Sequence, residues 1–454
     1  MKTYEDLVLA GQSEQARMEF VQEAVREHMA SDGYRTAEIA EKYVRRQNVT
    51  ISQYQKLLYT LAGQAVPDNY SANHKCKSGL FPYFITQENS YLLGNGVTFS
   101  EDNTKKKLGA GFDETIMQAG FWSLVHGCSY LFYNAEQCIL FRYTEFAPLY
   151  SEENGALTAG VRFWQITADK PMRYTLYEPD GYTEYIKRKD EDMQVLRDKR
   201  PYKLLARISA ADGTEIYGGM NYPSFPVVPL YGNKFHQSEL VGLREKIDCY
   251  DLIESGFAND VDDASMIYWT INNAGGMDDI DLAKFVERIK TVRAAVVDDD
   301  GAKAEAHTID APYQARQAAL QALKADMYED AMALDVRQIS AGNTTATQII
   351  AAYEPLNNKA DDFEVQVTTC ILGLLAVAGV EDIPSYSRSK IVNQMEETQM
   401  VMLAAAHLDE ETLLSKLPWL TPDDVAAVLD RREAEDFARF HGMGDDETLE
   451  DLNG

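Results

Sequence analysis

Basic residues are scarce in this sequence. Lys and Arg number 43 against 72 Asp and Glu, which gives a formal net charge of -29 at pH 7. A protein that clamps double-stranded DNA is normally basic, because Lys and Arg gain affinity by displacing counterions condensed on the duplex. The charge therefore leaves two possibilities: a protein without a nucleic-acid partner, or one past which DNA slides without adhering.

Cysteine is also rare and shows no pattern. The five cysteines are far apart, odd in number and without a C-x-x-C pair. This spacing argues against a disulfide framework and against a zinc knuckle. We expect all five to be small hydrophobic residues of the core, namely Cys76, Cys128, Cys138, Cys249 and Cys370.

Long apolar runs are missing. The longest, Ile371 to Val380, is interrupted by glycine and reaches roughly half of the ~20 residues that a membrane-spanning helix needs. The first residues carry scattered charges and lack the apolar core of a secretory signal. We therefore predict a protein made in the cytoplasm, without membrane contact, whose hydrophobic content of 45% is ample for a buried core.

Motifs for nucleotide binding or catalysis are missing as well. Gly94 and Gly96, like Gly109 and Gly111, do not complete a phosphate-binding loop and are predicted to be turn glycines. The sequence has neither an H-E-x-x-H nor a G-x-S-x-G motif. We predict no catalytic residue, no cofactor and no metal ligand, and do not expect an enzyme.

The pattern along the chain predicts an α+β fold that is mainly helical. Apolar spacing indicates helices from residue 1 to about 63, and a second helical stretch that ends near Tyr91. Between about Trp122 and Tyr231, alternating Tyr, Phe, Thr and Val indicate antiparallel strands. The two prolines of Phe225–Tyr231 limit that segment to a sheet edge.

Two long helices follow and flank a compact insert. Helical spacing covers 237–264 and 313–334, and the residues between them predict a small αβ unit with two strands, 265–271 and 293–297, around a helix. A stretch of small uncharged residues then precedes another long helix, in which Pro355 is expected to cause a kink.

Five local segments stand out around these helices: Tyr91–Phe99, Phe225–Leu230, Glu254–Asp263, Ser340–Thr345 and Glu411–Pro418. Each one consists mostly of turn and helix residues, and the specificity lies in their order. That order resembles the portal family of tailed bacteriophages, in the branch that includes the portal of Bacillus phage SPP1.

The resemblance implies a ring, usually of twelve subunits, at one vertex of the capsid in the virion, through which double-stranded DNA is packaged and ejected. It divides the chain into N-terminal helices and wing, 1–235; first stem helix, 236–264; clip, 265–312; second stem helix, 313–336; tunnel loop, 337–347; kinked wing helix, 348–383; helical crown, 384–441; and acidic tail, 442–454.

The resemblance also implies where this ring meets DNA and other proteins. The small uncharged residues of the tunnel loop that would face DNA are Ser340, Ala341, Gly342, Asn343, Thr344 and Thr345. The clip residues that would contact the large terminase subunit, an ATP-driven motor, are Asp281, Lys284, Glu287 and Arg288. A solvated helix face explains these four charges equally well. Further implied partners are the major capsid and scaffold proteins and a head-completion or adaptor protein.

Two other functions stay open. A metal-dependent hydrolase could hold Mg²⁺ with the acids Asp298, Asp299 and Asp300, next to His307. Three consecutive acids before a glycine point to different sides, however, and a solvated turn explains them without a metal. The second alternative is a capsid or head-completion subunit without a DNA channel, against which the two long helices argue.

Overall fold

The computed structural model describes residues 2–11, 13–59, 63–68, 71–209, 215–264, 268–272, 303–307, 313–337 and 346–388, with residues 401–403, 405, 408–417, 420, 425 and 427–432. The chain forms two compact units, Met1–Leu334 with Pro355–Arg388 and Asp335–Glu354 with Ser389–Gly454. In the second unit, α14 (Glu410–Ser415) is capped by Asp409, whose carboxylate accepts the N–H of Thr412. No helix in the described part of the chain is long and apolar enough to cross a membrane.

Antiparallel sheets form the strand-rich part of the first unit. The larger sheet has the order β10-β9-β8-β7-β6, with β6 (Phe146–Tyr150), β7 (Leu157–Trp164), β8 (Met172–Glu178), β9 (Gly181–Lys187) and β10 (Gln194–Arg200). A smaller sheet has the order β13-β4-β5, with β13 (Val227–Tyr231), β4 (Cys128–Tyr133) and β5 (Cys138–Arg142). The predicted antiparallel strands are therefore confirmed, and β13 lies at a sheet edge as its prolines require.

Short elements connect and extend these sheets. The 3-10 helix η1 (Tyr143–Glu145) links β5 to β6, and β11 (Lys203–Ser209) pairs with β12 (Glu215–Met220) in a separate hairpin. At the β8–β9 turn, Gly181 has φ 139°, a backbone conformation that favours glycine.

Four N-terminal helices lie in the first unit, and the second of them packs against the larger sheet. They are α1 (Tyr4–Leu9), α2 (Glu14–Ala30), α3 (Asp32–Val44) and α4 (Val49–Gln53). A capping box between Thr3 and Asp6 begins α1. The buried side chains Phe20 and Val21 of α2 join a cluster with Leu149 and Val161 of the sheet, so burial of an apolar helix face holds this layer in place.

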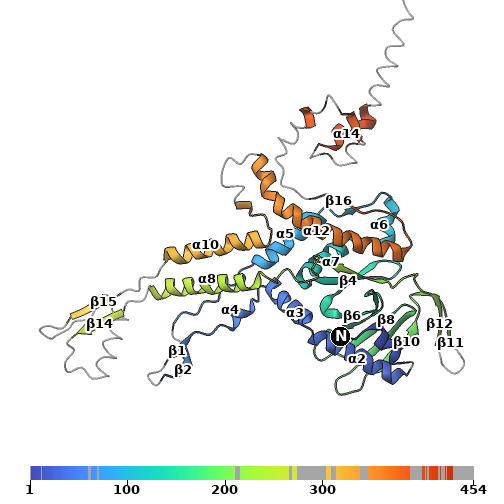
Figure 1. Cartoon of the computed structure of the whole chain (residues 1–454), viewed down its shortest axis with the longest axis horizontal. Coiled ribbons are helices and arrows are strands. Elements are labelled where there is room, and N and C mark those ends of the chain that lie inside the picture. The colour runs from blue at the N-terminus through green and yellow to red at the C-terminus, as the bar shows by residue number, and fades with distance from the viewer. Residues whose placement is uncertain are drawn as a thin grey trace, which may run out of the picture. The chain divides into compact units, whose positions relative to one another are not determined.

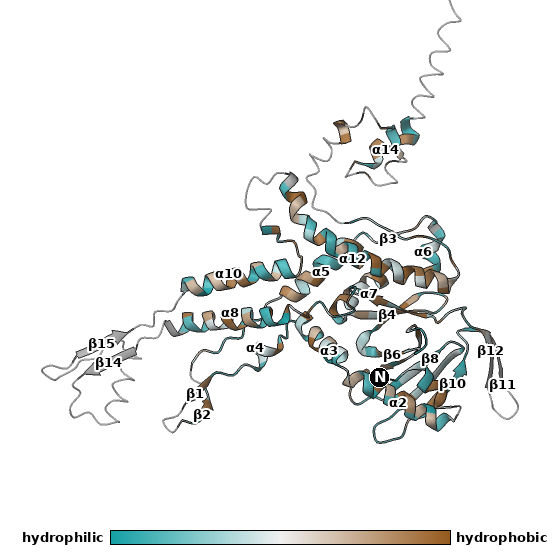
Figure 2. Ribbon diagram, in the orientation of Figure 1, coloured by the Kyte–Doolittle hydropathy of each residue, from teal (hydrophilic) through white to brown (hydrophobic). Residues whose placement is uncertain are grey.

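A second core lies where three helices meet the smaller sheet. These are α5 (Leu80–Leu93), α7 (Phe112–His126) and α12 (Ala346–Ala378). Apolar residues concentrate in α7 and in much of α12 (Figure 2). Close packing of α7 depends on Gly120, where a Cβ atom would lie 2.5 Å from Asn89 Oδ1 and 2.9 Å from Leu93 Cδ1.

After α12, the chain pairs with a strand from the N-terminal half of the sequence. Here β16 (Ser385–Tyr386) pairs with β3 (Val97–Thr98), and α6 (Asp102–Leu108) lies next to it. The side chain of Arg388 forms ion pairs with Asp361 and with Glu364 of α12, the latter at 2.8 Å. Pro355, at which the sequence predicts a kink, lies inside α12.

Two long helices project from the rest of the first unit. They are α8 (Arg244–Ala264) and α10 (Tyr313–Asp330), and beyond their ends β14 (Tyr268–Asn272) pairs with β15 (Lys303–His307) (Figure 1). The predicted helix–insert–helix order is therefore present in the described residues. The predicted strand 293–297 and the helix of the insert lie outside them, and the partner of β14 is β15, which sequence patterns did not predict as a strand.

The first long helix begins later than predicted. Helical spacing indicated a start near 237, whereas α8 begins at Arg244. The preceding residues form turns because Ser238 donates a hydrogen bond of 2.5 Å to the carbonyl of Val125, and Gly242 has φ 87°. Contact with the end of α7 overrides the local helical preference.

Two further predictions need correction. The helical stretch before Tyr91 begins only at Leu80, and the hairpin of β1 (Leu57–Tyr59) and β2 (Ala65–Pro67) precedes it. Cys249 is exposed on α8 and Cys76 is only partly buried, whereas the other three cysteines are buried as predicted.

Candidate functional site

The helices α8 and α10 form an antiparallel rod. Arg316 of α10 pairs with Asp260 of α8 at 2.7 Å, and Lys246 of α8 pairs with Asp330 at the opposite end of α10. Acidic residues outnumber basic ones in both helices. A rod of this composition would repel a polyanion outside direct contacts.

An extended segment runs along α8 and is bound through a ladder of side chains. Buried polar residues spaced one turn apart accept backbone N–H groups from alternate residues of the segment. The pairs are Ser78 N with Asp251 Oδ1 (2.9 Å), Cys76 N with Ser255 Oγ (2.9 Å) and His74 N with Asn259 Oδ1 (2.7 Å). The spacings match, since two extended residues advance about 6.6 Å and four helical residues about 6 Å. Two of the acceptors belong to the segment Glu254–Asp263, which was singled out in the sequence.

A buried charged cluster joins four parts of the first unit. The ammonium of Lys359 on α12 lies 2.8 Å from Glu88 Oε2 on α5 and 2.7 Å from Glu239 Oε2 in the segment before α8. The same ammonium donates a hydrogen bond of 3.1 Å to the carbonyl of Ala331, just after α10. Lys359 therefore contacts both the segment that precedes α8 and the residue that follows α10.

Burial and charge act in opposite directions on the pKa values of Glu88 and Lys359. Burial raises the pKa of Glu88 to about 8, against the opposing effect of Lys359. Burial alone would lower the pKa of Lys359, but the charges of Glu88 and Glu239 raise it. At neutral pH Glu88 is then mainly protonated, because its pKa lies above 7.

The end of α10 is held in an uncommon backbone conformation. Met332 has φ 51°, in the left-handed region that non-glycine residues rarely adopt. Two residues later, the side-chain amide of Gln87 donates to the carbonyl of Leu334 (2.9 Å) and accepts its N–H (2.8 Å). Gln87 directly precedes Glu88 on α5, so adjacent residues of one helix contact both features.

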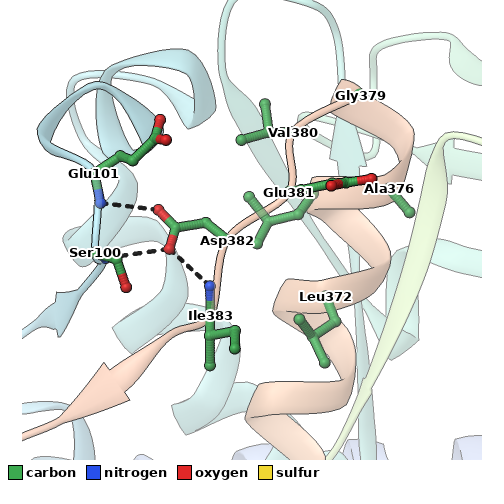
Figure 3. A pocket seen from close by; sticks show the side chains of 10 residues that line it. Ser100, Glu101, Leu372, Ala376, Gly379, Val380, Glu381, Asp382 and Ile383 are labelled. Atoms are coloured by element: carbon green, nitrogen blue, oxygen red, sulfur yellow. Dashed lines mark hydrogen bonds between the residues drawn. The ribbon is translucent and has the colours of Figure 1, made fainter.

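A surface pocket of about 770 Å³ lies at the end of α12 (Figure 3). Its apolar wall includes Leu372 and Ile383, and Asp382 points away from the helix toward Ser100 and Glu101. Asp382 accepts their backbone N–H groups at 3.1 and 3.2 Å. Hydrogen bonds, chiefly from Thr104, lower the pKa of Asp382 to about 2. The Asp382 carboxylate therefore serves to bind the adjoining backbone.

The site residues expected from the sequence lie outside the described residues. This holds for the tunnel-loop residues Ser340 to Thr345, the clip residues Asp281, Lys284, Glu287 and Arg288, and the acids Asp298 to Asp300. His307 belongs to β15. Among the residues that the structure describes, no group of three or more His, Cys, Asp or Glu side chains could hold a metal ion.

Sequence analysis missed the residues of the charged cluster. Glu88 stands in the largely apolar helix LFPYFITQENSYLL, and Lys359 is the single basic residue of α12. A charge at a core position is a recognisable signal of a buried pair. It does not identify the partners, which come from segments far apart in the sequence.

Comparison with known proteins supports the family. Over residues 40–438 the chain matches the family described as phage portal protein, SPP1 Gp6-like. The portal protein of Clostridium phage phiCD119 is 28% identical over 214 residues, 45% of this chain and 47% of that protein, so the chain matches about half of that relative's length. The portal protein of Bacillus phage SPP1 is 20% identical over 439 residues, 88% of this chain and 85% of that protein.

Solved structures of similar chains come from gene transfer agent particles. A chain from the neck of an empty particle, computed with C6 symmetry, has a TM-score of 0.43 at 11% identity and covers 75% of this chain and 90% of its own. A chain from the neck of a native particle, computed with C12 symmetry, has a TM-score of 0.39 at 10% identity and covers 75% and 89%. Because the family match extends over most of the sequence, this chain belongs to the SPP1 Gp6-like family of phage portal proteins.

Proposed function

We propose that the chain forms the portal ring of a tailed phage, a dodecamer at one capsid vertex through which double-stranded DNA enters and leaves. The acidic rod of α8 and α10, in a chain of the portal family, carries the proposal. Rods about 30 Å long, arranged around an axis, would enclose a hole. Acidic walls bind phosphates weakly, so that DNA would stay centred and mobile.

Electron microscopy of the purified protein tests this proposal. We expect particles with a central opening and, by symmetry of the class averages, twelve subunits. Monomers, sheets or closed shells would instead favour a capsid or head-completion subunit that has no channel. A channel lined mainly by Lys and Arg would also contradict the proposal, because such walls would hold DNA.

The segment between α10 and α12 is proposed to be the tunnel loop, with Ser340, Ala341, Gly342, Asn343, Thr344 and Thr345 facing DNA. The place of the segment between these two helices and the absence of charged side chains from Ser340–Thr345 support this assignment. Replacing Asn343 by Lys should slow DNA packaging by rings that still assemble, and the delay should shrink at higher salt. Asn103→Lys, on exposed α6, is the control and should package normally.

The insert beyond α8 and α10 is proposed to be the clip, which binds the large terminase subunit and later a head-completion or adaptor protein. This portal subunit has no recognisable nucleotide-binding motif, so in this proposal the terminase supplies the energy for packaging. Asp281, Lys284, Glu287 and Arg288 are the proposed contacts. Reversing Lys284 and Arg288 to Glu should abolish terminase binding while rings form normally, and unchanged binding would reject these contacts. Capsid and scaffold proteins are the proposed partners during assembly.

A further inference from the structure

Two adjacent residues of α5 hold α10 and α12, the two helices on either side of residues 331–345. Gln87 makes a reciprocal pair of hydrogen bonds with the backbone of Leu334, at 2.9 and 2.8 Å. Such a pair fixes both the position and the orientation of the peptide groups that it contacts, as a bridge between two strands does. The chain that leaves α10 is thereby attached to α5.

Glu88 holds the other helix. Its carboxyl group contacts Lys359, which lies one helical turn after Pro355 on α12. Lys359 also reaches across to the carbonyl of Ala331 at 3.1 Å, only three residues before Leu334. The end of α10 and the beginning of the buried part of α12 are therefore connected twice, once through α5 and once directly.

The chemistry of this cluster indicates a role other than stability. The side chains of Glu88 and Lys359 are only 3% and 14% exposed. Removing such charges from water is costly, and well-packed apolar residues often stabilise a core as well or better. A buried charge with fixed partners is best attested as a device that selects one register between packed elements, since in other positions the ammonium of Lys359 would lose its contacts with the two carboxyl groups.

We propose that Gln87, Glu88 and Lys359 form a clamp that makes the end of α10 and the adjoining part of α12 move as one body. A displacement of α12 is then passed to α10 instead of being absorbed between them. This inference rests on the proposed function, in which these helices flank the DNA-facing loop. There the clamp is a positioning device, because it makes the two ends of the loop move together during DNA passage.

Hydrogen exchange of the full-length protein, read by mass spectrometry, tests the clamp through effects at a distance. Gln87→Leu removes the two hydrogen bonds with Leu334 and one to the hydroxyl of Tyr83 on the same helix, and no contact with α12, yet it should speed exchange of the amides of Leu356 to Ala360 about threefold or more. Lys359→Met should speed exchange of the amides of Met332 to Leu334, beyond the Ala331 carbonyl that Lys359 contacts, about tenfold. Glu88→Gln keeps a hydrogen-bonding group in place and should change either peptide less than twofold.

The control is Lys246→Met, which removes the partly exposed ion pair with Asp330 at the same end of α10. It should leave the exchange of Leu356 to Ala360 unchanged. If Gln87→Leu and Lys359→Met each affect only the residues that they touch, the two helices are not coupled and the clamp is refuted. Because Gln87 is only half-buried, its variant remains informative should Lys359→Met fail to fold.

Ring formation and packaging separate this inference from the proposed function. Lys359→Met rings seen by electron microscopy should package several-fold less DNA than wild-type rings, whereas Lys246→Met rings should package normally. Normal packaging by Lys359→Met rings would overturn the role in DNA passage. If the wild-type protein forms no rings, the proposed function fails, while the exchange data still decide whether the clamp couples the two helices.

Discussion

Asp382, in the segment that follows α12, accepts a hydrogen bond of 2.6 Å from the hydroxyl of Thr104 on α6. The same carboxylate accepts the backbone N–H groups of Ser100 and Glu101 at the beginning of that short helix. Glu101 occupies the N-cap position without making a capping hydrogen bond through its own side chain. A residue distant in sequence therefore accepts the N–H of the N-cap residue, which the N3 side chain accepts in a capping box.

Replacing Asp382 by Ala should lower the melting temperature by about 1–3 °C, because the first N–H groups near α6 lose their acceptor. The pKa of this carboxyl in the folded protein, about 2, lies below its ordinary value of 3.8. Its contribution is therefore present above pH 4 and is lost as the pH falls toward 2. The difference between variant and wild type in thermal melts should shrink over that range. Glu381→Ala, at the neighbouring exposed position, is the control and should melt like the wild type.

Glu88→Gln should gain stability relative to the wild type as the pH rises. Burial raises the pKa of Glu88 to about 8 from its ordinary value of 4.5. The unfolded chain therefore releases this proton at lower pH than the folded chain, which costs the wild type stability between pH 4.5 and 8. Chemical denaturation at pH 5 and pH 8 should show the Gln variant gaining a few kcal/mol relative to the wild type. A difference that does not change with pH would contradict a protonated Glu88.

Ser255→Ala should destabilise the protein by about 1–3 kcal/mol, because the N–H of Cys76 would lose its acceptor in a partly buried place. The loss should be local. Hydrogen exchange should accelerate in residues 74–78, whereas the hydrophobic clusters keep their protection. Cys249→Ser changes an exposed residue of the same helix and should leave both stability and exchange unchanged. Exchange in 74–78 that stays slow in Ser255→Ala would refute the ladder as the attachment of this segment.

Gly120→Ala should cost about 1–3 kcal/mol, because the added methyl group would overlap Asn89 and Leu93 of α5. Phe363 of α12 lies 3.1 Å from the same point, so both neighbouring helices resist the change. Gly111→Ala is the matched control at the start of α7, where nothing lies within 4 Å of the added atom. Denaturant titration should separate the two variants clearly, and equal midpoints would mean that α5 and α7 can move apart without cost.

Local patterns predicted the elements that depend on neighbouring residues. Alternation identified the antiparallel strands, the prolines of Phe225–Tyr231 placed β13 at an edge, and helical spacing identified the rod of α8 and α10. The order of five short segments was enough to identify the family. Each single pattern can be read within about 20 residues, the range over which periodicity and turn chemistry act, whereas the order of the segments extends over most of the chain.

Other features depended on contacts between distant segments. The start of α8 was misplaced because Ser238 binds Val125, and Cys249 was expected in the core although its helix turns it to solvent. Neither outcome can be read from residues nearby in sequence.

The sequence by itself determined the acidic character, the missing catalytic motifs, the succession of elements and the family, since these follow from composition and short-range pattern. Only the tertiary structure decided that Gln87 and Glu88 hold Leu334 and Lys359, and that α8 binds an extended segment through buried side chains. The physical reason is that a hydrogen bond or ion pair depends on distances of about 3 Å, and the fold alone brings such residues together.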